Sequence, residues 1–216
     1  MSKNICPICG TQNCRQFFGD KIRTYLLCPN CQLIFVPSEF FLSAEDEKSR
    51  YDMHENNSND HNYRTFLSKL FNPMIERIKA KDLGLDFGSG PGPTLSVMFK
   101  EAGHKMKIYD HFYENNPSVL EKKYDFITAT EVVEHLHKPK EVLDKLWSIL
   151  KPGSTLGLMT KLSSGTKNFK KWHYKNDDTH VCFFSKITFE WLAKQWNAEI
   201  EFIGVDVILL RKTINQ

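Results

Sequence analysis

LGLDFGSGPGP, residues 83–93, is the stretch of the sequence that decides the fold. Apolar side chains alternate through Leu83, Leu85 and Phe87, which is typical of a β-strand, and glycines follow at positions 88, 90 and 92. Glycines at a strand end permit the positive φ of a sharp turn and let backbone N–H groups approach a ligand, since no Cβ intervenes. The stretch therefore predicts a strand, a tight ligand-binding turn and a following helix.

Two familiar phosphate-binding patterns fit this turn poorly. The dinucleotide fingerprint G-x-G-x-x-G needs a glycine where this chain has Pro93, and the sequence lacks the phosphate loop G-x-x-x-x-G-K-[ST]. The turn instead resembles the first motif of class I S-adenosylmethionine-dependent methyltransferases, whose glycines pack against the methionine and ribose parts of that cofactor. The resemblance implies that the cofactor is held by Asp86, Phe87, Gly88, Ser89, Gly90, Pro91 and Gly92.

Composition points to a globular protein. The chain has 216 residues, 41% of them hydrophobic, which is enough for one core and a small appendage. Its formal net charge of +3 is mild and does not by itself require nucleic acid or an anionic membrane as a partner. The sequence shows no apolar run of roughly 20 residues and no secretory signal in its first stretch, MSKNICPICG. We therefore expect a cytoplasmic protein without a membrane span.

Four cysteines near the N-terminus form two C-x-x-C pairs that are separated by 18 residues, namely Cys6 with Cys9 and Cys28 with Cys31. The spacing is typical of a zinc ribbon, in which each pair presents two thiolates from one tight turn. Because cysteine would fill all four positions, the Zn²⁺ would be structural and not catalytic. Free thiols or a redox motif remain the alternative. Cys14 and Cys182 are interpreted as small apolar residues.

The chain divides into three predicted parts. Residues 1–37 are the zinc ribbon, residues 38–79 an acidic connector followed by cap helices, and residues 80–216 the methyltransferase domain. Helical spacing from Asn62 to Ile78 is interrupted at Asn72-Pro73, which predicts a kink or a fresh helix start. The predicted fold is α/β: a Rossmann-like class I methyltransferase sheet, mostly parallel with an antiparallel last strand, preceded by the small ribbon.

The second predicted strand ends at Asp110, 24 residues after the aspartate of the first strand. A carboxylate at this place can accept hydrogen bonds from ribose hydroxyls, so Asp110 is the predicted ribose ligand. The resemblance extends the cofactor site to His111, Thr130 and Glu131. Only 13 residues separate Asp110 from Tyr124, so a third strand is absent or vestigial and the adenine site stays unassigned.

Residues 131–136, EVVEHL, resemble a segment that follows the fourth strand in ubiquinone-biosynthesis O-methyltransferases. If the segment is helical, Glu131, Glu134 and His135 share one face. The resemblance implies that these residues act on the acceptor and hold a Mg²⁺ ion, which would lower the pKa of an acceptor hydroxyl. The alternative is a helix N-terminus whose dipole favours acidic residues.

A basic and aromatic segment, residues 161–175, contains five lysines and no acidic residue and follows a predicted strand. A loop in this position lies at the rim of an open α/β sheet, which predicts an anionic or aromatic acceptor. Nucleic acid as a partner, or a simple solvated loop, remains the alternative.

Residues 174–185, YKNDDTHVCFFS, resemble a methyltransferase stretch that places a histidine against the methyl acceptor. His180 is therefore the candidate general base, because a neutral imidazole can take a hydroxyl proton near neutral pH. Asp178 or Tyr174 is expected to orient it. A purely structural histidine is the alternative.

Together these motifs predict an enzyme that transfers a methyl group from S-adenosylmethionine to a small-molecule acceptor, preferably to a hydroxyl oxygen. Two alternatives stay open. One is an RNA methyltransferase that binds its substrate through the ribbon and the lysine-rich segment. The other is a non-catalytic cofactor-binding or zinc-ribbon interaction module.

Overall fold

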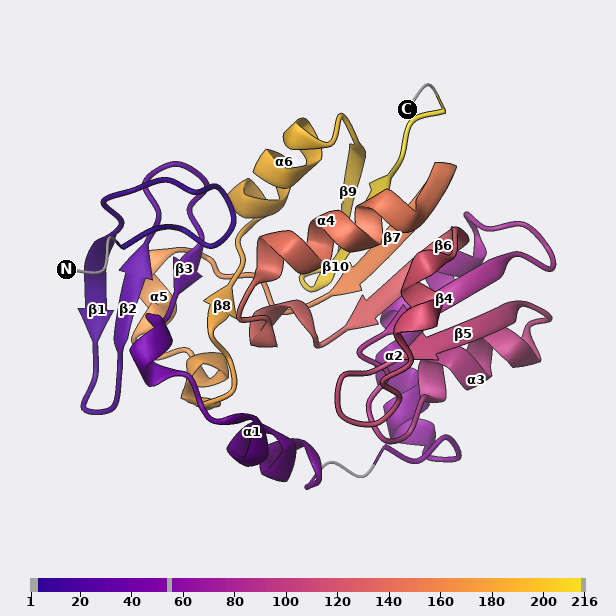
Figure 1. Cartoon of the computed structure of the whole chain (residues 1–216), viewed down its shortest axis with the longest axis horizontal. Helices are drawn as coiled ribbons and strands as arrows, with labels where there is room; N and C mark the ends of the chain where they lie inside the picture. Colours follow the sequence, from indigo (N-terminus) through magenta and orange to yellow (C-terminus); the bar gives the residue numbers. More distant parts are fainter. Residues whose placement is uncertain (1–3, 54–55, 215–216) are drawn as a thin grey trace.

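Two β-sheets organise the chain, whose computed structural model describes residues 4–53 and 56–214 (Figure 1). The larger sheet has six strands in the order β5-β4-β6-β7-β10-β9, and the smaller has four in the order β1-β2-β3-β8. The strands of the larger sheet are, in that order, Lys105–Tyr109, Leu83–Phe87, Tyr124–Thr130, Leu150–Met159, Val207–Arg211 and Glu199–Ile203. The strands of the smaller sheet are Arg15–Gly19, Thr24–Leu27, Ile34–Phe35 and Cys182–Phe183.

The strand directions confirm the predicted Rossmann-like sheet. β5, β4, β6 and β7 run parallel, whereas β10 is antiparallel to both of its neighbours, β7 and β9. Residues 110–123 form turns, an isolated bridge and the 3-10 helix η2 (Pro117–Glu121) where a third strand would otherwise lie. The third strand is therefore absent from the described residues, as the short spacing predicted, and β5 is an edge of the sheet.

Four helices pack on the larger sheet: α2 (His61–Ile75), α3 (Thr94–Glu101), α4 (Pro139–Ile149) and α6 (Lys186–Gln195). Side chains alternate along the strands, so neighbouring residues of β7 face opposite layers. Met159 belongs to the apolar cluster of α2 and α3, whereas Leu158 belongs to that of α4 and α6. The sheet is thus buried between two helical layers (Figure 1).

One helix boundary differs from the sequence expectations, and one helix leads directly into a strand. α2 continues through Pro73 to Ile75, so the predicted fresh helix start is wrong. Leu70 and Met74 hold the last turn of α2 close to Gly157 of β7, and this packing offsets the hydrogen bond that proline cannot donate. Residues 151–153 lie inside β7, because α4 leads directly into that strand.

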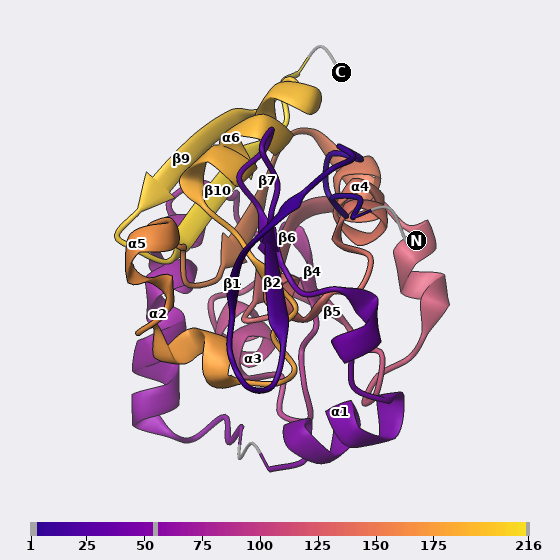
Figure 2. The same ribbon diagram turned by 90° about the vertical axis from the view of Figure 1, so that its left-hand side faces the viewer.

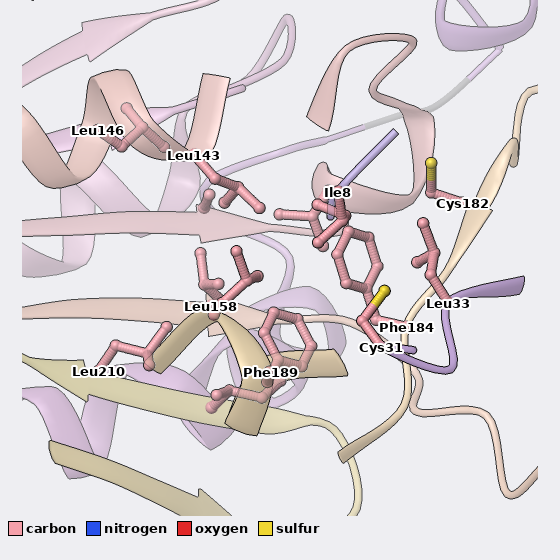
Figure 3. Packing of buried hydrophobic residues seen from close by; sticks show 14 of the residues in the cluster. Ile8, Cys31, Leu33, Leu143, Leu146, Leu158, Cys182, Phe184, Phe189 and Leu210 are labelled. Atoms are coloured by element: carbon pink, nitrogen blue, oxygen red, sulfur yellow. The ribbon is translucent and has the colours of Figure 1, made fainter. Parts of the chain in front are cut away.

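The smaller sheet joins the ribbon to the C-terminal half of the chain. β3 of the ribbon pairs with β8, with Ile34 opposite Phe183. Figure 3 shows that Ile8 and Leu33 of the ribbon lie beside Phe184, inside one apolar cluster that continues into the larger sheet. Figure 2 views the molecule from this side, with β1 and β2 nearest the reader.

The connector forms the 3-10 helix η1 (Ser38–Phe40) and the helix α1 (Ala44–Tyr51). Ser43 caps α1 by accepting a hydrogen bond from the backbone N–H of Asp46. The division of the chain at residues 1–37, 38–79 and 80–216 stays a prediction. Residues 1–3, 54–55 and 215–216, which this division includes, lie outside the described residues.

Candidate active site

One cavity of about 940 Å³ opens where β4, β5 and β6 end. This is the edge at which open parallel sheets bind their ligands. The glycine-turn wall of the cavity consists of residues 87–91, 109–113 and 130–132. The histidine wall, as we call the second wall, consists of Glu47, Tyr51, His135, His137, Tyr174, Asp177 and His180.

The glycine turn has the backbone that the sequence predicted. Gly88 has φ of 71° and Gly90 has φ of 64°, values that L side chains rarely adopt. A Cβ on Gly88 would lie 2.3 Å from Val132, so this glycine is needed for close packing as well as for its φ. The backbone N–H of Gly90 donates to Asp110 Oδ2 at 2.9 Å, which ties the turn to the end of β5.

Most of the predicted cofactor residues line the cavity: Phe87, Gly88, Ser89, Gly90, Pro91, Asp110, His111, Thr130 and Glu131. Ser89 Oγ and Thr130 Oγ1 are buried and have no hydrogen-bond partner among the described residues. Buried hydroxyls are nearly always paired, so this wall offers two groups to a polar ligand.

Asp86 and Gly92 lie behind the glycine-turn wall. Asp86 is buried and accepts a hydrogen bond of 2.8 Å from Thr128 Oγ1, and burial raises its pKa to about 7. A Cβ on Gly92 would lie 1.7 Å from the backbone oxygen of Asn56, so this glycine serves close packing against the connector. Their assignment as direct cofactor ligands stays a prediction without support from the cavity lining.

The segment EVVEHL does not form the helix that its predicted shared face requires. Glu131 has φ of 51°, and only the single 3-10 turn η3 (Val133–His135) follows. Glu131 lines the cavity, whereas Glu134 is completely buried beneath it, and burial raises its pKa to about 8. The hydroxyl of Tyr174 donates toward Glu134 and lies 3.3 Å from Glu131 Oε2.

The metal-binding geometry of this segment also differs from the predicted set. Ligand atoms of Glu134, His135 and His180 lie within 4.8 Å of one another, and Glu131 is not part of this group. Two imidazoles and one carboxylate suit a transition ion, whereas Mg²⁺ prefers oxygen ligands. The arrangement therefore does not fit the predicted Mg²⁺ site, and we assign no ion to it.

His180 sits in the histidine wall with a defined orientation. Its Nδ1 lies 2.7 Å from the backbone oxygen of Tyr174. A carbonyl oxygen only accepts, so Nδ1 carries the proton and Nε2 of the neutral ring keeps its lone pair. Burial lowers the pKa of His180, while Asp177, whose Oδ2 lies 3.7 Å from Nε2, opposes that shift. Asp178 instead pairs with Arg50 at 2.8 Å.

Helix α1 contributes residues to the histidine wall that the sequence reasoning missed. Glu47 Oε1 lies 2.9 Å from His137 Nε2, and the ring of Tyr51 packs edge-on against His135 at 5.3 Å. The acidic composition of the connector indicated a solvated segment. The aromatic Tyr51, one turn after Glu47 in an otherwise polar helix sequence, was a signal that one face of this helix is covered.

Acidic groups line the cavity. Glu47, Asp110, Glu131 and Asp177 line it, and none of the described lining residues is a lysine or an arginine. The lysine-rich segment 161–175 contributes His173 and Tyr174 to this lining, and Lys161 lies next to it, with Nζ 3.2 Å from His173 Nε2.

Other residues of that segment are buried against the ribbon. Phe169 is 1% exposed and its ring lies 5.2 Å from that of Phe17, and Lys175 is 8% exposed with Nζ 3.5 Å from Asp20. The segment contains the short helix α5 (Thr166–Phe169) and the 3-10 helix η4 (His173–Asn176). Its aromatic residue Phe169 is therefore not available for stacking on a planar acceptor or a nucleic acid base.

The four predicted metal ligands of the ribbon come together. Cys6 Sγ lies 3.5 Å from Cys31 Sγ, Cys9 Sγ lies 3.3 Å from Cys28 Sγ, and all four sulfurs are within 4.8 Å of one another. Four thiolates around a zinc ion are separated by about 3.8 Å, so the cluster has a suitable size. The neighbouring Cys31 thiol lowers the pKa of Cys6 to about 6, which makes a thiolate accessible.

Comparison with known protein families agrees with this geometry. A family model described as a methyltransferase domain matches residues 59–201, which is more than half of the chain. The chain therefore belongs to the methyltransferase domain family. Its resemblance to class I S-adenosylmethionine-dependent methyltransferases is confirmed at the level of family and fold.

Among curated proteins, ubiquinone biosynthesis O-methyltransferases are similar to part of the chain. That of Proteus mirabilis (strain HI4320) is 24% identical over 103 residues, which is 48% of this chain and 40% of that protein. That of Yersinia pestis (strain Pestoides F) is 28% identical over 98 residues, which is 45% of this chain and 39% of that protein. The similarity thus spans less than half the length of these relatives.

Solved structures show the same fold at low identity. The Burkholderia thailandensis 1,6-didemethyltoxoflavin-N1-methyltransferase, with bound 1,6-didemethyltoxoflavin and S-adenosylhomocysteine, has a TM-score of 0.55 and 14% identity and covers 92% of this chain and 99% of that chain. The magnesium protoporphyrin IX methyltransferase of Synechocystis PCC 6803 with bound S-adenosylhomocysteine has a TM-score of 0.56 and 12% identity, with coverages of 81% and 97%. None of the helices within residues 4–53 and 56–214 has the length and apolar content that crossing a membrane would take.

Proposed function

We propose that the chain transfers the methyl group of S-adenosylmethionine to a hydroxyl oxygen of a small molecule. The observation that supports the proposal is that the glycine-turn wall and His180 border the same cavity. Because the Tyr174 oxygen engages Nδ1 of His180, Nε2 is the nitrogen that can act as a base. The cavity volume of about 940 Å³ lies at the upper end of the range of ligand pockets, about 300–1,000 Å³, and suits two ligands side by side. The curated O-methyltransferase relatives support oxygen as the acceptor atom.

The glycine-turn wall is proposed as the cofactor site. When bound, S-adenosylmethionine supplies a methyl group that is activated by a positively charged sulfur. A carboxylate has about four lone-pair positions, and Asp110 already accepts from the backbone N–H groups of Gly90, Phe112 and Tyr113. About one position is left, which suits a single ribose hydroxyl. Ser89 and Thr130 would pair with further polar groups of the cofactor.

The histidine wall is proposed as the acceptor site. Nε2 of His180 takes the acceptor proton while the oxygen attacks the methyl carbon, and the carbon–sulfur bond breaks with its electron pair left on sulfur. The backbone oxygen of Tyr174 holds the imidazole in the tautomer that this role requires. The protein contributes mainly orientation, because the methyl group arrives activated.

The charge of the cavity favours a neutral or cationic hydroxylated acceptor over an anionic one. A phosphate or carboxylate in the cavity would face Glu47, Glu131 and Asp177 without a lysine or arginine in the described lining. Carboxylates and imidazoles instead accept hydrogen bonds from hydroxyl groups. This proposal replaces the anionic acceptor that the lysine-rich segment had suggested.

The four-cysteine cluster is proposed to hold a structural Zn²⁺ through Cys6, Cys9, Cys28 and Cys31. Its sulfur separations and its position in the ribbon support this proposal. The thiol groups leave no coordination position for substrate, so the ion would stabilise the ribbon only.

The test compares the chain with its His180→Asn variant. The amide of the substituted side chain can still donate to the Tyr174 oxygen, but it cannot take a proton. We expect methyl transfer to fall by about 10²–10⁴-fold while the dissociation constant of S-adenosylhomocysteine, measured by calorimetry, stays unchanged. Transfer would be followed from methyl-labelled S-adenosylmethionine to a panel of neutral diphenols and sugars, with their carboxylated analogues and a short RNA as controls. Unchanged turnover in the variant, or preference for the carboxylated members, would contradict the proposal.

A further inference from the structure

The tip of the ribbon hairpin carries a buried arginine. Arg23 lies between β1 and β2 and is only 5% exposed. Asp20 fixes this tip, because its Oδ1 accepts from the backbone N–H groups of Ile22 at 2.9 Å and of Arg23 at 3.0 Å. The hairpin therefore presents the guanidinium in a defined direction, toward the loop that precedes β8.

Each N–H group of the Arg23 side chain has an acceptor. Nε donates to Tyr25 Oη at 3.0 Å, Nη1 donates at 3.1 and 3.0 Å, and Nη2 makes two short bonds. The acceptors of Nη1 and Nη2 are the backbone oxygens of Asp178, His180, Lys175 and Asp177. A guanidinium has five N–H donors in a planar fork, and a lysine ammonium cannot reach the same acceptors from one point.

These acceptors belong to the loop that carries His180. The ribbon also holds the residue after His180, since the backbone N–H of Val36 donates to the Val181 oxygen at 2.9 Å. From the other side, the N–H of Val181 donates to the Glu134 oxygen at 2.9 Å. His180 therefore lies in a short segment whose backbone is tied to the ribbon before and after it.

Fastening the ribbon to the rest of the chain does not by itself require this arginine. An aromatic contact already joins the two parts. The ring centroid of Phe169 lies 5.2 Å from that of Phe17 and 5.0 Å from that of Tyr25 in the ribbon. Burying a guanidinium costs desolvation energy that an apolar side chain would avoid. The position of its acceptors, around His180, is what distinguishes Arg23 from an ordinary packing residue.

We propose that Arg23 is a positioning residue, through which the ribbon sets the backbone of residues 175–180 and thereby the orientation of His180. The inference rests on the proposed function of His180 as the base. It makes the ribbon part of the acceptor site, although no ribbon side chain lines the cavity among the described residues.

The experiment compares the variants Arg23→Ala and Arg23→Lys with Phe17→Ala, which loosens the aromatic contact and leaves the arginine in place. Hydrogen exchange detected by mass spectrometry reports on residues 175–181, and long-range ¹H–¹⁵N NMR reports the tautomer of His180. Zinc content and S-adenosylhomocysteine binding are measured for each variant.

In Arg23→Ala we expect exchange in residues 175–181 to be about tenfold faster or more, and the His180 tautomer to become mixed. Arg23→Lys keeps the charge but makes fewer hydrogen bonds, so its exchange rate should lie between those of the wild type and Arg23→Ala. This variant also provides the test if Arg23→Ala does not fold. Phe17→Ala should lower the melting temperature only. Wild-type exchange and tautomer in a zinc-loaded Arg23→Lys or Arg23→Ala variant would overturn the proposal. Neither hydrogen exchange nor the tautomer measurement uses turnover. An active His180→Asn variant would therefore refute His180 as the base without deciding whether Arg23 orients it.

Discussion

The two walls of the cavity are built by contacts of very different range. In the glycine-turn wall, the bond from Gly90 to Asp110 joins residues 20 positions apart, and the wall comes from three stretches that end adjacent parallel strands. The loop that supplies Asp177 and His180 to the histidine wall is held by bonds of longer range. The bond from Arg23 to the His180 oxygen joins residues 157 positions apart, and that from Arg50 to Asp178 joins residues 128 apart. The first wall is a property of the sheet, and the second is a property of the assembled chain.

The difference indicates that the acceptor side can fail while the cofactor side persists. Apart from the contact of Gly92 with Asn56 of the connector, the glycine turn is held by the strands and the loops of the sheet. The loop of His180 is instead bonded to the ribbon, to α1 through Arg50, and to Glu134 of η3. Variants should therefore separate cofactor binding from methyl transfer, and the following predictions run from the largest expected effect to the smallest.

Cys28→Ser should have the largest effect. Structural zinc contributes about 10–16 kcal/mol of folding free energy in zinc-finger peptides, so loss of one ligand should unfold the ribbon. We expect loss of zinc by mass spectrometry, a strong fall in melting temperature and loss of transfer, with weak S-adenosylhomocysteine binding kept at low temperature. Cys14→Ala, a buried cysteine outside the cluster, is the matched control. Full zinc content in Cys28→Ser would contradict the assigned ligand set.

Gly88→Ala should damage the glycine-turn wall directly. The new Cβ would lie 2.3 Å from Val132 at a φ of +71°, so both overpacking and backbone strain apply. Together they should cost about 2–5 kcal/mol in urea unfolding. Gly103→Ala is the control, since its φ is +89° but a Cβ there meets nothing within 4 Å. Equal losses in the two variants would show that the contact with Val132 is unimportant.

The two aspartates of the cofactor side should respond differently to replacement by asparagine. Asp110→Asn puts an amide donor against backbone N–H groups and should weaken S-adenosylhomocysteine binding by about tenfold or more. Asp86 lies behind the wall with a raised pKa of about 7, so Asp86→Asn should change the affinity by less than about threefold. Calorimetric titration of both variants with S-adenosylhomocysteine measures the two affinities. A larger loss of affinity in Asp86→Asn than in Asp110→Asn would make Asp86 the direct ligand.

The pH dependence of methyl transfer tests the protonation of His180. Only the neutral imidazole can take a proton, and burial lowers the pKa of His180 below its ordinary value of 6.5. We therefore expect kcat/KM to rise with pH, with a midpoint below 6.5, and to fall about tenfold per pH unit further down. A midpoint above 6.5, or an acid limb that persists in His180→Asn, would assign the limb to another group.

The glycine-turn wall was largely predictable because its information is local. The spacing of glycines after an alternating strand correctly predicted the turn, and the short distance from Asp110 to the next strand correctly predicted that a third strand is missing. Asp86 and Gly92 are the exceptions on this side. Both belong to the recognisable pattern, but their side-chain positions face the core and the connector, which a motif does not reveal.

The histidine wall was predictable only in part. The helical face expected for EVVEHL failed because Glu131 adopts a positive φ that no glycine signals. The lysine-rich segment suggested a basic rim, yet Phe169 and Lys175 face the ribbon, which lies far away in the sequence. Arg23 carried no local signal at all, because its acceptors are backbone oxygens, which every residue has.

The sequence by itself determined which chemical groups are available: the glycine turn, Asp110, the four ribbon cysteines and His180 are all recognisable from residue type and spacing. Local spacing specifies strands, turns and paired thiols, because these depend on neighbouring residues. Only the tertiary structure decided which groups meet, namely that Glu134 and His135 approach His180, that α1 lines the cavity, and that Arg23 holds the loop of the base. Those contacts depend on burial and on backbone direction across the whole chain, and neither is contained in a local pattern.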